Sequence, residues 1–178
     1  MRKKAKHIFL LFVSTVFVIV TFAQTKNEQI KLIREKSGII NKDTTLKKVI
    51  LENEEFLEEM TDHGGTLVGY YKIGEIKKIY ESIGLSNGIT IREFYFDNGQ
   101  LIFVYEKFES FVFDDKKGEF DFSQTKTIFE GRYYFSNEKL FNKSTKGDKS
   151  LVTLYESTEG TLLGRAKDVI ESLNKNAN

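Results

Sequence analysis

The chain contains no cysteine, no proline and no tryptophan, and it has only two histidines among its 178 residues. Without cysteine, no disulfide can stabilise the fold, and no thiolate can bind a metal or act as a nucleophile. His63 is the single histidine after residue 23, so histidine-rich metal sites are not supported either. Because proline is absent, glycine, asparagine and aspartate must form the turns. We expect no metal and no cofactor.

Motifs for nucleotide chemistry are also missing. No glycine-rich phosphate-binding loop follows a strand pattern, which argues against nucleotide-dependent enzymes of the common folds. The 27 basic and 26 acidic residues are interspersed along the chain. Nucleic-acid binding needs a concentrated positive surface, so we expect no nucleic-acid partner. With no catalytic motif in the sequence, we expect a protein that is not an enzyme.

Residues 1–23 have the three parts of a cleavable secretory signal peptide. A basic segment precedes an apolar run over residues 8–22, and Ala23 supplies the small residue before the cleavage point. The run is shorter than the roughly 20 residues of a membrane-spanning helix, which favours a cleaved signal over an uncleaved anchor. We therefore expect an exported protein, periplasmic or extracellular, that meets the membrane only through its signal peptide. Residues 24–178 should form a single domain.

The periodicity of apolar residues predicts an α+β fold. Helical patterns cover residues 27–40 and 159–174, and the second has an apolar stripe and Thr158 as its N-cap. Residues 44–51 favour a strand and residues 54–60 one or two helical turns, whereas residues 150–155 fit either a strand or an early start of the last helix. Between residues 66 and 140, short aromatic and β-branched runs alternate with turns. We expect an antiparallel β-meander of about six strands, with the N-terminal and C-terminal helices packed on one face.

The Asn98-Gly99 dipeptide is the strongest turn signal in the chain. Between apolar strands it predicts a type I′ hairpin with positive φ at both central residues. Simple alternation then places Glu93 opposite Val104 and Ile91 opposite Glu106. One face would carry Arg92, Phe94, Phe96, Leu101, Phe103 and Tyr105, and we expect it to be core. The other face would carry Ile91, Glu93, Tyr95, Ile102, Val104 and Glu106.

Three segments resemble one another, each with two aromatic residues before a turn and an aliphatic residue after it. They cover residues 70–76, 95–101 and 134–140. This unit resembles the MORN-type repeats of many bacterial proteins, although Glu138 stands where that pattern has glycine. The order of signal, helix, hairpins and helix is similar to that of uncharacterised small exported proteins of Gram-negative bacteria. The resemblance implies export and fold, and it assigns no functional residue.

Two carboxylates are the sharpest candidates for chemistry. In the expected register, Glu93 and Glu106 lie diagonally across one face, about 7–8 Å apart. A pair of carboxylates on a partly apolar surface is the arrangement that glycoside hydrolysis uses. The simpler interpretation is that each one is solvated or neutralised by a nearby lysine or arginine.

Other polar and aromatic groups have structural explanations beside the functional ones. His63 lies in an Asp-His-Gly-Gly turn, where a general base is conceivable but no nucleophile is visible nearby. The acidic loop over residues 114–121 does not match a calcium-binding loop. Tyr70, Tyr95 and Tyr133 could line an exposed binding face, or they could simply be core.

Three functions remain open at this point. The first is a non-enzymatic envelope protein that binds a protein or peptide partner through an open sheet face or edge. The second is a hydrolase of envelope glycans that uses Glu93 and Glu106. The third is a carrier of a small apolar ligand, which a pocket between the sheet and the terminal helix would favour.

Overall fold

A computed structural model describes residues 25–148 and 157–176. The chain divides into two compact units, Met1–Ile39 and Ile40–Asn178. Helix α1 covers residues 25–42, which confirms the helix expected over residues 27–40. The expected signal peptide and the ambiguous segment 150–155 lie outside the described residues. Neither helix in the described ranges has the length and apolarity needed to cross a membrane.

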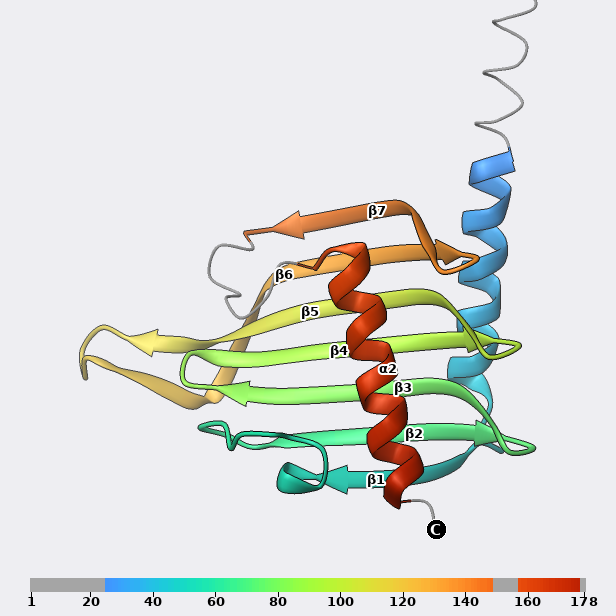
Figure 1. The fold of residues 1–178 in the computed structure, drawn as a ribbon. Helices are drawn as coiled ribbons and strands as arrows, with labels where there is room; N and C mark the ends of the chain where they lie inside the picture. Colours follow the sequence, from blue (N-terminus) through green and yellow to red (C-terminus); the bar gives the residue numbers. More distant parts are fainter. Residues whose placement is uncertain (1–24, 149–156, 177–178) are drawn as a thin grey trace, which may run out of the picture. The chain divides into compact units, whose positions relative to one another are not determined.

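The second unit is built on one antiparallel sheet in which each strand pairs with the next one along the chain (Figure 1). Its strands are β1 (Lys47–Glu52), β2 (Gly65–Lys72), β3 (Glu75–Leu85), β4 (Gly88–Asp97), β5 (Gln100–Asp114), β6 (Glu119–Ser136) and β7 (Lys139–Gly147). A short 3-10 helix, η1 (Asn53–Glu55), follows β1, and helix α2 (Glu159–Asn176) ends the unit. The fold is therefore α+β, as expected.

Within the described residues the sheet has seven strands, where about six were expected. The turns of the three repeated segments join β2 to β3, β4 to β5 and β6 to β7, which accounts for six strands, and a fourth two-residue turn joins β3 to β4. The seventh is β1, which the sequence predicted as a strand over residues 44–51. It pairs with β2 from Lys47↔Tyr71 to Glu52↔Thr66 and so extends the sheet at one edge.

The turns of the three repeated segments have the same backbone conformation. Both central residues take positive φ at Asn98-Gly99 (49° and 74°), which confirms the predicted hairpin. Ile73-Gly74 and Asn137-Glu138 do the same, with φ of 52° and 78° and of 50° and 57°. Positive φ at both positions is the property of a type I′ turn, whose twist matches that of the flanking strands.

Each of these hairpins also has a β-bulge next to its turn, at the aromatic pair that the sequence repeats. The register shifts at Tyr70/Tyr71, at Tyr95/Phe96 and at Tyr134/Phe135. In the middle hairpin, Phe96 pairs with Leu101 but Tyr95 pairs with Phe103, so Ile102 is the extra residue. The three segments thus resemble one another in sequence because each forms the same turn with a β-bulge beside it.

The bulge corrects the register expected for β4 and β5. Asp97↔Gln100 and Phe96↔Leu101 are as expected, but Glu93 pairs with Tyr105 and Arg92 with Glu106. One inserted residue reverses the sides of all the β5 residues beyond it. Phe103 and Tyr105 therefore leave the expected core face, and Val104 and Glu106 join it.

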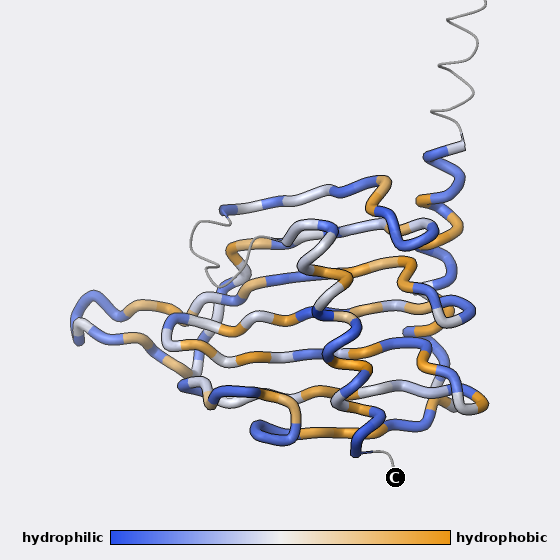
Figure 2. The backbone as a smooth tube through the Cα atoms, in the orientation of Figure 1, coloured by the Kyte–Doolittle hydropathy of each residue, from blue (hydrophilic) through white to orange (hydrophobic). Residues whose placement is uncertain are grey.

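The two faces of the sheet differ in what they carry. The helix face, which α2 crosses (Figure 1), includes Leu67, Ile79, Phe94 and Val104, all fully buried or nearly so. The opposite face carries a cross-strand row in which Tyr70 pairs with Lys78, Lys78 with Tyr95, Tyr95 with Phe103 and Phe103 with Tyr134. Figure 2 shows the resulting alternation of hydrophobic and hydrophilic residues along the central strands.

Helix α2 closes the core over the helix face. Its apolar stripe consists of Leu162, Ala166, Val169 and Leu173, each at most 3% exposed. Thr158 is the N-cap, since its hydroxyl oxygen accepts a hydrogen bond from the backbone N–H of Thr161. Burial of each large apolar side chain stabilises the fold by about 1.5–3 kcal/mol, so this stripe fixes α2 on the sheet.

Candidate binding pocket

Three charged residues lie side by side across the helix face of the sheet. Glu81 on β3 pairs with Arg92 on β4, which pairs with Glu106 on β5. The guanidinium of Arg92 donates from Nη1 to Glu81 Oε2 at 3.1 Å and from Nε to Glu106 Oε1 at 3.0 Å. Both carboxylates are 0% exposed. A single arginine therefore bridges two fully buried acids.

Two hydroxyl groups among the described residues also donate to Glu106. The hydroxyl of Ser157, just before α2, donates to Glu106 Oε2 at 2.6 Å, and the hydroxyl of Tyr133 donates to the same oxygen at 3.1 Å. Gly131, which pairs with Glu106 on β6, makes room for this contact. A Cβ atom at Gly131 would come within 2.6 Å of the Tyr133 ring, which lies over it. Tyr133 is thus held where its hydroxyl can reach the buried acid.

Glu81 is held from the helix as well as from the sheet. Arg165 on α2 donates from Nε to Glu81 Oε1 at 2.7 Å, and its Nη2 lies 2.6 Å from the same oxygen. The four groups carry two positive and two negative formal charges. Buried carboxylates of this kind are tolerated only when they are paired and hydrogen-bonded, and here both conditions are met.

The surroundings raise the pKa values of two groups in this network, Arg92 and Tyr133. Burial alone would lower the pKa of Arg92, but the carboxylates of Glu81 and Glu106 raise it above the usual arginine value. Burial, reinforced by the charge of Glu106, raises the pKa of the Tyr133 hydroxyl far above its usual range. Arg92 therefore stays charged and Tyr133 stays a neutral donor.

A pocket of about 640 Å³ opens beside this network, between α2, the ends of β3 and β4, and the segment after η1. Its lining residues are Phe56, Leu57, Glu58, Glu59, Thr61, Ile83, Leu85, Thr90, Arg92, Ser157, Thr161, Leu162, Gly164, Arg165 and Asp168. The volume lies within the roughly 300–1,000 Å³ of typical small-molecule sites. One wall is apolar. Arg92 and Arg165, which belong to the buried charged network, also line the pocket.

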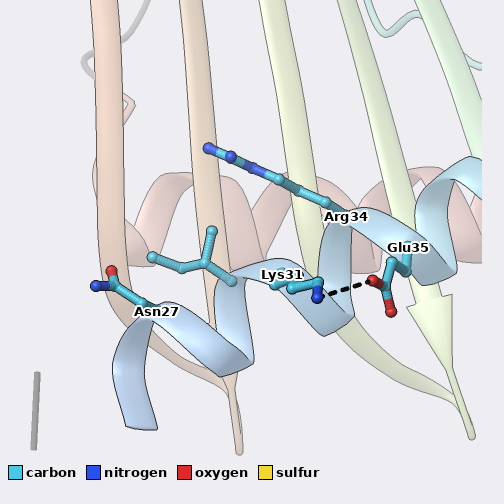
Figure 3. A pocket seen from close by; sticks show the side chains of 5 residues that line it. Asn27, Lys31, Arg34 and Glu35 are labelled. Atoms are coloured by element: carbon cyan, nitrogen blue, oxygen red, sulfur yellow. Dashed lines mark ion pairs between the residues drawn. The ribbon is translucent and has the colours of Figure 1, made fainter. Parts of the chain in front are cut away.

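A second hollow lies along α1 in the first unit. Figure 3 shows its lining side chains, with Lys31 and Glu35 joined by an ion pair of 3.9 Å. Both partners are more than half exposed, so water screens the pair and it is worth little. We therefore centre the candidate site on the pocket beside α2.

The structure separates the residues that the sequence proposed as one site. Glu106 and Tyr133 lie on the helix face and are hydrogen-bonded to each other. Glu93 lies on the opposite face, where it accepts from the hydroxyl of Tyr95 at 2.6 Å and pairs with Lys78 at 2.6 Å. Glu93 and Glu106 are thus not brought together. The physical reason is the bulge at Ile102, which turns Glu106 to the other side.

The three tyrosines do not form one face either. Tyr70 and Tyr95 share the opposite face with Lys78, whose Nζ lies 5.8 Å and 5.2 Å from the two ring centroids. Tyr95 is 1% exposed, and burial raises the pKa of its hydroxyl. Tyr133 is also 1% exposed, but on the helix face. The core interpretation fits Tyr95 and Tyr133, and Tyr70 is half-buried.

Neither His63 nor the acidic loop lines the pocket. The His63 ring packs against Phe111 and Phe122, with centroid distances of 5.1 Å and 4.8 Å. In the loop, Asp114 accepts from the backbone N–H of Lys116, which is a local turn contact. Among residues 25–148 and 157–176, no group of three or more histidine, aspartate or glutamate side chains could hold a metal ion.

Sequence reasoning named a pocket between the sheet and the terminal helix only as part of the carrier hypothesis, and it missed the residues Glu81, Arg165 and Ser157 beside that pocket. The signal available for Glu81 was Asn87-Gly88, which indicates a hairpin between β3 and β4. A type I′ turn centred on it would pair Glu81 with Phe94, whereas the observed turn pairs Leu85 with Gly88 and Glu81 with Arg92. No comparable signal exists for Arg165, which meets Glu81 across 84 residues.

Comparisons with protein-family models, curated proteins and solved structures found no match.

Proposed function

We propose that this is an exported, non-enzymatic protein that binds a small ligand with an apolar body in the pocket beside α2. The observation that carries the proposal is a pocket of about 640 Å³ with an apolar wall, set between the sheet and the terminal helix. Phe56, Leu57, Ile83, Leu85 and Leu162 form that wall. Binding sites for small molecules are concave and mostly apolar, with a few fixed polar groups.

The polar groups of the pocket are suited to keeping its wall in place rather than to taking part in a chemical reaction. Arg92 and Arg165 only donate hydrogen bonds, and each is oriented by Glu81. The two acids behind them are fully buried and already bonded, so neither is placed to exchange protons with a ligand. The two arginines therefore fix the shape of the pocket wall, so that binding requires no reorganisation there.

A protein or peptide partner at the sheet stays a separate prediction. Lysines lie on both edge strands, with Lys47 and Lys48 on β1 and Lys139, Lys143 and Lys146 on β7. Charged residues on an edge oppose the pairing of further strands. The pocket therefore supports a small ligand more directly than the sheet edges support a peptide.

Two glycines of α2 allow a sharp test of the pocket. Gly164 lines it, Gly160 does not, and a Cβ at either position would meet no atom within 4 Å. Gly164→Phe should fill the pocket without disturbing the core, and Gly160→Phe is the matched control. Both changes also replace a glycine within a helix, which favours folding.

The uncharged fluorescent probe Nile red reports the outcome. We expect its fluorescence to rise on mixing with the full chain, to fall clearly with Gly164→Phe and to be retained with Gly160→Phe. The difference in fluorescence between the two variants separates probe binding in the pocket from probe binding to any other apolar part of the chain. Equal fluorescence of both variants and the wild type would overturn the proposal.

A further inference from the structure

We infer that the ligand of this pocket is a cationic amphiphile, a molecule with an apolar body and a protonated amine. The inference rests on the proposed function and specifies the class of ligand. Its basis is the distribution of charge around the pocket, in which the positive groups are already neutralised and the negative groups at the rim are not.

The two arginines are not available as a binding site for an added anion. Arg92 is bonded to Glu81 and Glu106, and Arg165 is bonded to Glu81 through two nitrogens. The two guanidiniums and two carboxylates have no net formal charge. An anion placed here would add a third negative charge to a set that is already balanced.

The rim of the pocket carries three acidic residues, Glu58, Glu59 and Asp168, and all three are exposed. No ion pair joins any of them to another residue described in the structure. By contrast Glu171, one turn further along α2, pairs with Lys175 at 2.8 Å. The lining therefore has a net negative formal charge at its mouth.

Apolar and acidic parts of the pocket are adjacent in the chain. Phe56 and Leu57 precede Glu58 and Glu59 directly, and Leu162 and Asp168 belong to the same helix. An alkyl chain lying on the apolar wall would bring an attached ammonium group to the carboxylates at the rim. Apolar burial would supply most of the affinity, and charge complementarity would select the head group.

Three probes with the same eight-carbon chain separate these contributions: octylammonium chloride, sodium octanoate and 1-octanol. Chemical-shift titrations of the full chain, labelled with ¹⁵N, give the three affinities, with Gly164→Phe as the reference for pocket-dependent binding. We expect octylammonium to bind about five- to tenfold more tightly than octanol, and octanoate to bind most weakly. The advantage of octylammonium should shrink as salt is added.

A charge variant and a matched control complete the experiment. Glu58→Gln, Glu59→Gln and Asp168→Asn together should make octylammonium bind like octanol, while octanol binding stays unchanged. The control triple Asp115→Asn, Glu119→Gln and Glu138→Gln removes the same number of exposed acids elsewhere and should preserve the preference.

The outcomes distinguish the two proposals. If no probe shows binding that depends on Gly164, the proposed function fails. If octanol binds in the pocket but octylammonium binds no more tightly, only the cationic class is overturned. If octanoate binds best, the ligand is an anion and the inference is wrong. Loss of the preference in the control triple would show that the overall charge, and not the rim, selects the ligand.

Discussion

Arg165 on α2 and Glu81 on β3 are joined by two contacts of 2.6–2.7 Å although 84 residues separate them in sequence. This pair ties the terminal helix to the middle of the sheet, beside the pocket. Arg92 completes the arrangement from β4 by bonding to the other oxygen of Glu81. The helix that forms one wall of the pocket is thus positioned by a buried charge as well as by its apolar stripe.

Arg92→Met should destabilise the fold strongly. The change removes the guanidinium that bridges the buried carboxylates of Glu81 and Glu106. Removing one partner of a buried ion pair typically costs about 3–5 kcal/mol, because the remaining charge is uncompensated. Urea unfolding measures the difference in the free energy of unfolding. Lys175→Met, which breaks an exposed pair, is the control and should leave it nearly unchanged, because water screens that pair. Similar losses for both variants would contradict the role given to Arg92.

Gly131→Ala should also destabilise the protein, by about 1–3 kcal/mol. The added methyl group would collide with the Tyr133 ring, which lies 2.6 Å from the Cβ position, and would push its hydroxyl away from Glu106. Gly160→Ala is the matched control, because its Cβ meets no atom and it should stabilise α2 slightly. Thermal unfolding of both variants gives the comparison. An unchanged melting temperature for Gly131→Ala would mean that Tyr133 is not held over the glycine.

Stability should fall as the pH rises from about 10 to about 12. Burial, together with the hydrogen bond that its hydroxyl donates to Glu130, raises the pKa of Tyr105 from 10.0 to about 12. The folded state keeps this proton in a range where the unfolded chain has lost it, so the stabilising contribution is complete below pH 10 and disappears as the pH passes the raised pKa. Urea midpoints across this range measure the effect. Tyr105→Phe should lose less stability over the same interval than the wild type, and an equal loss would show that Tyr105 does not contribute.

Glu138→Gly should stabilise the β6–β7 hairpin by about 0.5–1 kcal/mol. Glu138 has φ of 57°, a conformation that is unfavourable for a residue with a side chain and natural for glycine. Ile73→Asn offers an independent check, because Ile73 has φ of 52° and is 97% exposed, and asparagine accepts this conformation more readily. Chemical denaturation curves give both values. Loss of stability in both variants would indicate that the side chains, and not the turn conformation, matter at these positions.

The sequence predicted the local features of the fold. Asn98-Gly99 defined its hairpin, the repeated aromatic pairs marked the other two, and the apolar stripe of α2 identified the terminal helix with its cap at Thr158. These features depend on residues that are close in the chain, so propensity and periodicity describe them well. The fold class followed from them.

The bulges and the charged network could not be predicted in the same way. Inserting Ile102 as an unpaired residue leaves the alternation of side chains intact on each side of it, so the sequence shows no break in the pattern. Because the bulge was not predicted, the expected register of β4 and β5 was wrong. It placed Glu106 on the face of Glu93 instead of the face of Arg92, and the candidate site built on that pair was therefore wrong as well. Arg165 on α2 also looked like an ordinary charged residue beside the apolar stripe, since only tertiary packing brings it to Glu81.

The row formed by Glu81, Arg92 and Glu106 also restricts how the strands can assemble. A shift of β4 by one residue against β3 would set either Glu93 or Ile91 opposite Glu81, which gives the acid a second carboxylate or an apolar side chain in place of its cation. A shift by two residues would set Thr90 or Phe94 there and leave the acid without its cation as the sheet closes over it. Misaligned sheets would therefore be less stable than the native one, because only one pairing of the central strands places the arginine between the two buried acids.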